Sequence, residues 1–204
     1  VPMASVAAPS ERPVSVDAAS SRGTNQTGVR LYNERLVLSL IRHHVRLPKA
    51  EIARLTGLSP QTISIITNQL TADGLLLKGT PRRGRVGQPS VPYSLNPEGA
   101  FSFGLKVGRR SVDLYLINFT GAVLNLLHRI YPYPTPDGIL GFARAGIAEL
   151  LAGVPEEQAR RIAGLGIAAP YEMWTWHQEI GAPKGDIDAW RTRDIRAEIA
   201  RLCP

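Results

Sequence analysis

The amino-acid sequence predicts an α+β fold made of two parts. In the first part, apolar residues recur at helical spacing between about residues 29 and 70. In the second part, three strand-like runs follow one another between residues 101 and 128, separated by glycine-containing turns. The charge is unevenly divided, because residues 1–100 carry 12 Lys/Arg and 6 Asp/Glu whereas residues 101–204 carry 12 and 11. The two parts are therefore expected to have different partners.

The composition narrows the class of protein. A chain of 204 residues with 44% hydrophobic content can bury a core, and a net charge of +7 favours a polyanionic partner such as nucleic acid. The single cysteine, Cys203, forms no intrachain disulfide and no Cys-x-x-Cys metal or redox pair. No apolar run reaches the roughly 18 residues of a membrane span, and the N-terminus lacks the pattern of a secretory signal. A cytoplasmic protein is expected, with no membrane association and with no metal or cofactor bound by this chain.

The first element is a one-sided helix that follows a flexible arm. Residues 1–28 are rich in Ala, Ser, Pro, Thr and Gly without any period, which is typical of a flexible segment. From Val29 to His44 the apolar residues predicted to face inward are Leu36, Val37, Leu40 and Ile41.

Two shorter helices come next. Lys49 to Thr56 predicts a helix with Ile52, Ala53 and Leu55 turned inward, and Gly57 is placed to end it in the left-handed conformation. Ser59 can cap a third helix, in which Pro60 takes the first position. The inward residues of this third helix are Ile63, Ile66 and Leu70.

A hairpin completes the first domain, which spans residues 29–97. Asp73 and Gly74 end the third helix, after which Leu75 to Leu77 can pair with Val91 to Leu95 across a loop rich in Gly, Pro and Arg.

The second domain, residues 98–204, begins with an antiparallel meander. Its strands are predicted over Phe101–Val107, Ser111–Asn118 and Ala122–His128. A helix over residues 137–152 follows, and then Ile162 to Ala169 reads as an apolar strand suited to burial on both faces. Trp190 to Leu202 predicts one final helix.

The segment Lys49 to Leu70 has the spacing of a DNA-binding helix-turn-helix. Five side chains remain on the free face of the second helix of this motif: Gln61, Thr62, Ser64, Ile65 and Asn68. The side-chain amides of Gln61 and Asn68 can each form two hydrogen bonds with an adenine. Thr62 and Ser64 can reach bases or phosphates, and Ile65 can contact a thymine methyl group. The same residues are also typical of a solvated helix face. The residues of the turn, the inward apolar stripe and the local positive charge together favour contact with DNA.

The loop Thr80 to Pro92 stands where the tip of a hairpin wing is expected. It carries Arg82, Arg83 and Arg85 among glycines that permit close approach to a phosphate or to the minor groove. Alone it would be interpreted as a solvated basic loop. Its position directly after a helix-turn-helix favours contact with the DNA backbone.

Three stretches of the sequence resemble the transcriptional-repressor branch of the ROK family: GTNQTGVRLYNERLVLSLI, LPKAEIARLTGLSPQTIS and GQPSVPYSLNPEGAFSFGLKVGRRSVDLYLINFTGAVL. The likeness runs from about Gly23 to Pro204. It implies a winged helix-turn-helix followed by a partial actin/ribonuclease H-like α/β lobe of the sugar-kinase type. It also implies a homodimer and a sugar or sugar-phosphate effector.

The resemblance carries over residue by residue. It implies DNA reading by Gln61, Thr62, Ser64 and Asn68, and it places Gln88, within Gly87-Gln88-Pro89, where members usually carry the Arg of a Gly-Arg-Pro wing motif. Kinase members have an Asp-Gly-Gly-Thr phosphate loop where this chain has Lys106 to Arg110, so an acidic metal-organising group is missing. Their catalytic aspartate, Glu/His sugar motif and cysteine-rich zinc site would follow the end of this chain. No catalytic residue is therefore assigned, and the protein is not expected to be an enzyme.

Three further features of the sequence have simpler explanations. Gly164-Leu165-Gly166 favours close backbone packing over nucleotide binding. Trp174, Trp176, His177 and Glu179 favour a half-buried strand over a sugar platform. His43, His44 and His128 show no metal spacing.

The sequence thus predicts a sequence-specific regulator, a sugar-responsive repressor of carbohydrate metabolism that binds double-stranded DNA as a homodimer. The flexible arm, the basic loop and the start of the third helix at Ser59 would supply affinity, while the polar face would supply specificity. Two alternatives stay open. One is a carbohydrate kinase or sugar-binding protein with an appended winged domain. The other is a truncated fragment of a regulator, whose unfinished second lobe would expose apolar strand surface.

Overall fold

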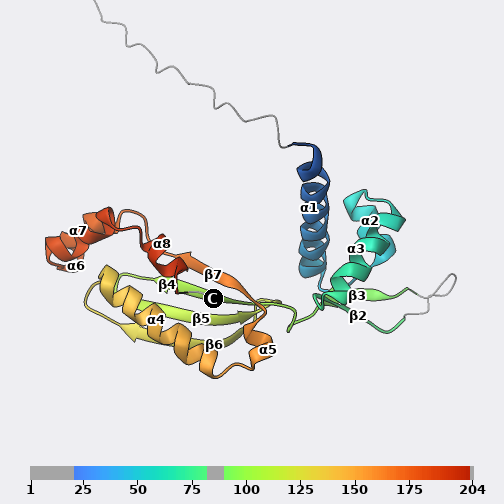
Figure 1. Cartoon of the computed structure of the whole chain (residues 1–204). Coiled ribbons are helices and arrows are strands. Elements are labelled where there is room, and N and C mark those ends of the chain that lie inside the picture. The colour runs from blue at the N-terminus through green and yellow to red at the C-terminus, as the bar shows by residue number, and fades with distance from the viewer. Residues whose placement is uncertain (1–20, 82–89, 203–204) are drawn as a thin grey trace, which may run out of the picture.

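The computed structural model describes residues 21–81 and 90–202, which form two parts joined by a short connection (Figure 1). We call the first part the winged domain. Its elements are α1 (Ser21–His44), β1 (Leu47–Pro48), α2 (Lys49–Thr56), α3 (Pro60–Ala72), β2 (Leu76–Lys78) and β3 (Pro92–Leu95).

The winged domain is held by one apolar cluster between its helices and a small sheet. Val37 and Ile41 of α1, Ile52 of α2 and Ile63 of α3 are each 0% exposed. The sheet has the order β1-β3-β2 and is antiparallel, with Leu76 opposite Leu95. The predicted three helices and hairpin are confirmed, and the two-residue β1 is an addition that the sequence did not indicate.

The second part, which we call the lobe, is a four-stranded sheet with helices. Its elements are β4 (Phe101–Val107), β5 (Ser111–Asn118), β6 (Val123–Ile130), α4 (Pro136–Ala152), α5 (Glu156–Ala159), β7 (Ile162–Ala168), the 3₁₀ turn η2 (Met173–Trp176), α6 (His177–Ile180), α7 (Lys184–Thr192) and α8 (Ile195–Ala200). The strand order is β6-β5-β4-β7. The first three strands form the predicted antiparallel meander, and β7 runs parallel to β4. The α+β class is confirmed.

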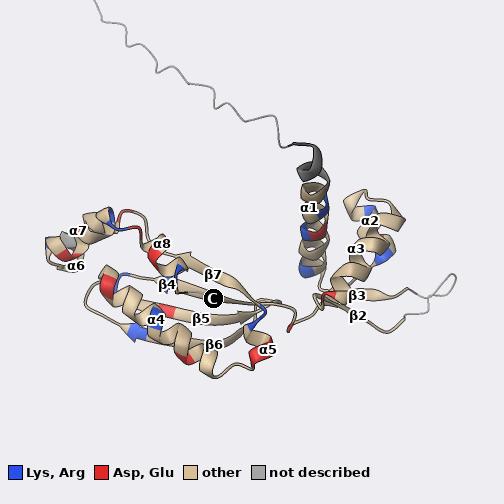
Figure 2. Cartoon of the chain, viewed as in Figure 1, with Lys and Arg blue, Asp and Glu red and all other residues tan. Residues whose placement is uncertain are grey.

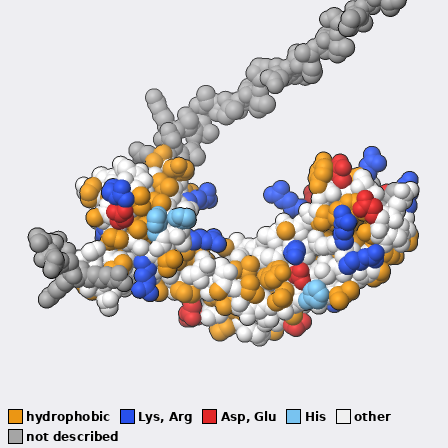
Figure 3. Space-filling view, turned by 180° about the vertical axis from the view of Figure 1, so that it is seen from behind, with side chains coloured by type: hydrophobic (Ala, Val, Ile, Leu, Met, Phe, Trp, Pro, Cys, Tyr) orange, Lys and Arg blue, Asp and Glu red, His pale blue; other side chains and the backbone are white. Residues whose placement is uncertain are grey.

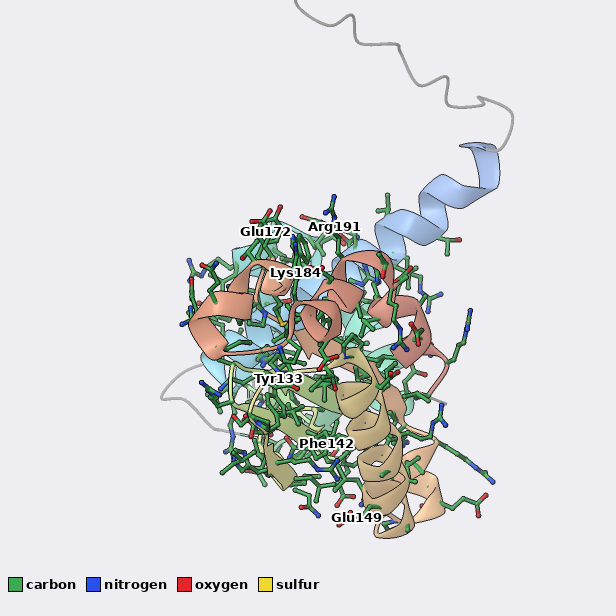
Figure 4. The ribbon with its side chains drawn as sticks, turned by 90° about the vertical axis from the view of Figure 1, so that its left-hand side faces the viewer. Tyr133, Phe142, Glu149, Glu172, Lys184 and Arg191 are labelled. Atoms are coloured by element: carbon green, nitrogen blue, oxygen red, sulfur yellow. The ribbon has the colours of Figure 1, made fainter. Side chains whose placement is uncertain are left out.

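Helix α4 covers one face of this sheet. Phe103, Leu114 and Phe142 belong to the core between them. Gly146 allows a close approach, because a Cβ there would lie 2.7 Å from Cδ2 of Leu114. In Figure 4, Tyr133 lies between α4 and the α7 region, where its hydroxyl donates to Asp186 at 3.0 Å. The lobe therefore has a well-packed core on its α4 side.

The opposite face of the sheet is open, and apolar side chains gather on it (Figure 3). On the edge strand β6, Val123 is 54%, Leu126 46% and Ile130 75% exposed. Exposed apolar surface of this kind marks a surface that a partner can cover.

The two parts meet in a defined junction. Phe119 of the lobe packs against the apolar cluster of the winged domain, and its backbone N–H donates to Pro97 O at 3.2 Å. Arg161 donates to Gly99 O at 3.1 Å, and its guanidinium lies beside the turn at Gly74. A Cβ on Gly99 would lie 2.9 Å from Gly74 O, so this close approach of two backbones requires glycine.

Several expectations for the winged domain need correction. Helix α1 begins at Ser21 rather than Val29, so the flexible arm predicted over residues 1–28 is wrong for residues 21–28, and residues 1–20 lie outside the described residues. Once a helix exists, each added residue gains a backbone hydrogen bond at small cost, without needing a buried face. Leu55, predicted to face inward, is 38% exposed.

Other corrections concern the lobe. Strand β7 is an edge strand rather than one buried on both faces, and Ile167 on it is 38% exposed. The helix predicted over Trp190–Leu202 is two helices, because Arg193 is extended and Asp194 caps α8 by accepting from Ala197 N at 3.0 Å.

Two short motifs of the lobe also differ from expectation. The segment with Trp174 and Trp176 is a 3₁₀ turn followed by α6, not a strand. Gly164 has φ +142°, and no atom lies within 4 Å of a Cβ built on it. Backbone conformation at an irregular β4–β7 register, rather than close packing, therefore explains this glycine.

Among the described residues, no helix combines the length and apolar character needed to cross a membrane.

Candidate nucleic-acid interface

A short turn held by several hydrogen bonds joins α2 to α3. Gly57 has φ +70° and donates its backbone N–H to Ala53 O at 2.9 Å, which ends α2. Thr56 Oγ1 donates to Ile52 O at 2.8 Å and accepts from Leu58 N at 3.3 Å. The angle between the two helices is thus set by the turn as well as by their packing.

The start of α3 is capped by Ser59. Its Oγ accepts from Thr62 N at 3.1 Å and lies 2.8 Å from Thr62 Oγ1, while Pro60 takes the first helical position. Both hydroxyls therefore already take part in the cap. Their predicted contacts with DNA stay predictions, and the cap itself fixes the helix N-terminus, where a phosphate binds well.

One side of α3 is buried in the winged domain. Ile63, Ile66 and Leu70 are 0%, 5% and 2% exposed, which confirms the predicted inward stripe. Thr67 is also 0% exposed, and its hydroxyl donates to Ile63 O at 2.7 Å, so this buried polar group is satisfied. Helix α3 packs on α1, α2 and β2, all elements of its own domain.

The other side of α3 remains accessible. Gln61 and Asn68 are exposed, Ile65 is 64% exposed, and Ser64 and Thr62 are half-buried. Thr62 and Ile65 also line a hollow of about 320 Å³ between α3 and α1. The structure therefore brings the five predicted residues to one open helix surface, and the lobe does not cover it (Figure 1).

Lys49 is a member of this surface that the sequence did not single out. Its Nζ donates to Asn68 Oδ1 at 3.2 Å and lies 5.6 Å from the centre of the Tyr93 ring. Lys49 lies at the start of one helix and 19 positions before Asn68, so the sequence spacing does not predict this contact. It places a cation beside a helix that has no charged residue of its own.

The cations around α3 come from neighbouring elements (Figure 2). Figure 2 shows Lys and Arg along α1 and α2. On α2, Arg54 is paired with Glu51 at 3.1 Å, and this contact lowers the pKa of Glu51 below its ordinary value. A neutral polar helix flanked by cations is the arrangement expected where bases are read and phosphates are held by different residues.

The four predicted wing residues, Arg82, Arg83, Arg85 and Gln88, lie outside the described residues. The stem that carries them is described. Lys78 is opposite Tyr93, and Gly79 N donates to Pro92 O at 2.8 Å. The basic loop therefore connects two paired strands, as a wing does.

Charged side chains of the described lobe lie close to one another in two groups. Lys106 lies 3.9 Å and His128 2.6 Å from Asp113, which is 8% exposed, on three adjacent strands. Arg109, from the predicted basic turn, stacks over Trp176 at 4.6 Å and pairs with Glu179 at 3.7 Å. These contacts pair the charges in these two groups with one another.

The described lobe also shows no grouping of metal-ligating side chains. No three His, Cys, Asp or Glu residues group as metal ligands within residues 21–81 and 90–202. A cavity of 680 Å³ runs beside β7, but its lining is apolar except for Arg196.

Comparison with known proteins agrees with this geometry. Residues 30–76 match a family described as winged helix-turn-helix DNA-binding. The N-terminal domain is a winged helix-turn-helix. The match begins within α1, ends at the first residue of β2, and includes the turn and the open surface of α3 described above.

Longer relatives extend the similarity into the lobe. The chain is 22% identical over 175 residues to the xylose repressor of Bacillus subtilis, covering 86% of this chain and 44% of that protein. It is 24% identical over 149 residues to a putative xylose repressor of a Caldicellulosiruptor species, covering 72% and 37%. A ROK family transcriptional regulator, a homolog of the E. coli MLC protein, shares the fold with a TM-score of 0.51 and 21% identity, covering 68% and 35%.

These comparisons confirm the predicted resemblance to ROK-type repressors. The relatives are named as repressors or regulators, which favours a regulator over an enzyme for this chain. The chain spans less than half the length of each of these relatives.

Proposed function

We propose that the chain is a sequence-specific DNA-binding transcriptional repressor that places α3 in the major groove. The observation that carries this proposal is the two-sided nature of α3. Its apolar side is buried to within 5% exposure, while Gln61, Ile65 and Asn68 face solvent on an uncovered surface. A rigid helix with an exposed amide and methyl surface matches the chemistry of base edges in the major groove.

Affinity and specificity come from different residues in this proposal. Gln61 and Asn68 read adenine, and Ile65 contacts a thymine methyl. Ser64 and Thr62 contact bases or phosphates near the capped start of α3, beside Ser59. Arg82, Arg83, Arg85 and Gln88 hold the adjacent backbone or minor groove through the wing.

The repressor acts as a cytoplasmic homodimer that responds to a sugar or sugar-phosphate effector and regulates carbohydrate metabolism. The xylose repressors among the relatives support the sugar response and the repressing action. A dimer is favoured because a helix-turn-helix reads a palindromic operator with two copies whose half-sites lie about one helical turn apart. The lobe serves as the effector and dimerisation part, requires no cofactor, and is not an enzyme.

Selection of bound duplexes from a random pool tests the proposal directly. At a stated salt concentration, the full chain should enrich one half-site motif containing adenines at the positions read by Gln61 and Asn68. The variant Gln61→Ala should change preference at one position of the motif. Enrichment of no motif by the full chain, with binding that depends only on salt, would contradict sequence-specific recognition.

A further inference from the structure

A second candidate site lies in the junction between the winged domain and the lobe. A cavity of 580 Å³ is bounded by α1 on one side and by the nearby ends of β4 and β5 on the other. The α1 residues that line it share one helix face, since they recur at spacings of three and four: Arg35, Leu38, Ser39 and Arg42. The neighbouring face, with Val37 and Ile41, is buried in the winged domain. Helix α1 therefore has one surface for its own domain and another for this cavity.

The lining of the cavity is rich in donors and has apolar walls. The walls are Leu38, Leu95, Phe101, Ile117 and Phe119, and no Asp or Glu is among the described residues that line it. Asn118 Oδ1 already accepts from Thr120 N, Thr120 Oγ1 and Ala122 N at 2.9–3.1 Å, so the amide offers its Nδ2–H groups. Ser39 and Ser102 add hydroxyls.

Two arginines supply the charge. Arg35 and Arg42 are exposed, and neither forms an ion pair within the described residues. The guanidinium of Arg42 reaches the β5–β6 turn, with Nη2 3.4 Å from the position of a Cβ on Gly121. Lys and Arg side chains are visible on the side of the winged domain that faces the lobe (Figure 3).

We propose that this junction cavity binds an organic anion, a carboxylate or phosphate ester carried by an apolar body. A guanidinium binds such an oxyanion in bidentate geometry, and the aromatic and aliphatic walls bury the body of the molecule. The volume lies in the range of small-molecule sites. An uncharged sugar leaves both arginines without a partner, and a simple inorganic anion leaves the walls solvated, so neither uses the whole site.

The position of the cavity gives its occupant a role. A bound anion contacts α1 of the winged domain and β4–β5 of the lobe at once. It therefore stabilises the relative orientation of the two parts, next to the existing junction contacts of Phe119 and Arg161. The effect on operator affinity rests on the proposed function, whereas the binding itself does not.

The test titrates the full chain with phenyl phosphate and with benzoate by calorimetry, without DNA. Phenol and inorganic phosphate serve as comparison ligands that carry only the body or only the charge. We expect saturable binding of at least one organic anion, with an affinity that falls at least about tenfold in Arg35→Gln/Arg42→Gln. The stronger of the two anions identifies the head group.

A matched control and a second variant keep the outcome unambiguous. Arg144→Gln/Arg191→Gln removes the same charge from two exposed arginines of α4 and α7 that do not line the cavity, and this variant should bind as the original chain does. Ser39→Leu keeps both arginines but fills part of the cavity, and it should also weaken binding. Absence of saturable binding, equal affinity in the Arg35/Arg42 variant, or equal affinity for inorganic phosphate and phenyl phosphate would each overturn the proposal. Since no DNA is present, failure of operator recognition leaves this result unaffected.

Discussion

Lys49 and Asn68 allow a quantitative test of how α3 reads DNA. In the proposed complex, the Asn68 amide bonds an adenine, and such a bidentate contact contributes about 1–3 kcal/mol of discrimination, or about fivefold to 150-fold in affinity. Asn68→Ala should therefore weaken operator binding by that factor and leave binding to a random duplex almost unchanged. The amide is oriented by Lys49 Nζ at 3.2 Å. Because this bond is exposed, its contribution is expected to be about 0.5–1.5 kcal/mol.

A double-mutant cycle separates the two roles of Lys49. Lys49→Ala should weaken both duplexes, since a cation is lost, and should weaken the operator more, since Asn68 is no longer held. The coupling energy between Lys49→Ala and Asn68→Ala, measured by fluorescence anisotropy on the operator, should be about 0.5–1 kcal/mol. Lys78→Ala, on the stem of the wing, is the control and should show no coupling to Asn68→Ala. Purely additive effects at Lys49 and Asn68 would refute the idea that the lysine orients the amide.

Four further outcomes are expected. Gln61→Ala should relax base preference at one operator position. Arg83→Ala should weaken binding to all duplexes alike and reduce the slope of log affinity against log salt by about one. If both variants lost affinity equally on operator and random duplex, this division of roles would be contradicted. Gly99→Ala should lower the free energy of unfolding by about 1–3 kcal/mol in urea titrations, because its Cβ would meet backbone atoms at 2.9–3.1 Å. Gly141→Ala is the control: its Cβ would have open space around it, so this variant should not destabilise the chain. The hydrogen bonds from Arg193 lower the pKa of Glu198 below its ordinary value of 4.5. The stability that these bonds add is therefore present above pH 4.5 and is lost as the pH falls through the lowered pKa. In that pH range the thermal midpoint should fall more steeply in the original chain than in Arg193→Gln, and parallel curves would exclude the contribution. ATP-dependent phosphorylation of sugars by the purified chain should be absent, and robust turnover would reverse the choice of regulator over kinase.

The helix-turn-helix was predictable because its boundaries are set by local chemistry. Gly57 takes the left-handed conformation, Ser59 caps and Pro60 begins the next helix, all as their residue types predict. The buried stripe of α3 follows from helical period alone. The exposed polar residues of α3 could therefore be assigned to one surface before any coordinates were known.

The features that were missed depend on contacts between distant segments. The exposure of β7 follows from its place at the edge of the sheet. The order of the strands cannot be predicted from the apolar pattern of one strand alone. The break between α7 and α8 is stabilised by Arg193, which bonds both Glu198 and the distant Asp137. Lys49 reaches the open surface of α3 only because α2 folds against α3.

The junction between the two parts determines what the lobe can do to DNA binding. Phe119 packs against the apolar cluster of the winged domain, and Arg161 bonds the connecting backbone at Gly99, so α3 has a defined orientation relative to the sheet. In a dimer formed through the lobes, the distance between the two copies of α3 would then be set by the lobes and not by a flexible tether. Operator half-sites accept only spacings near whole helical turns, so a small rotation at this junction is enough to lose one half-site. An effector therefore needs no direct contact with the helix-turn-helix to release the operator, provided that it changes the packing around Phe119 and Arg161.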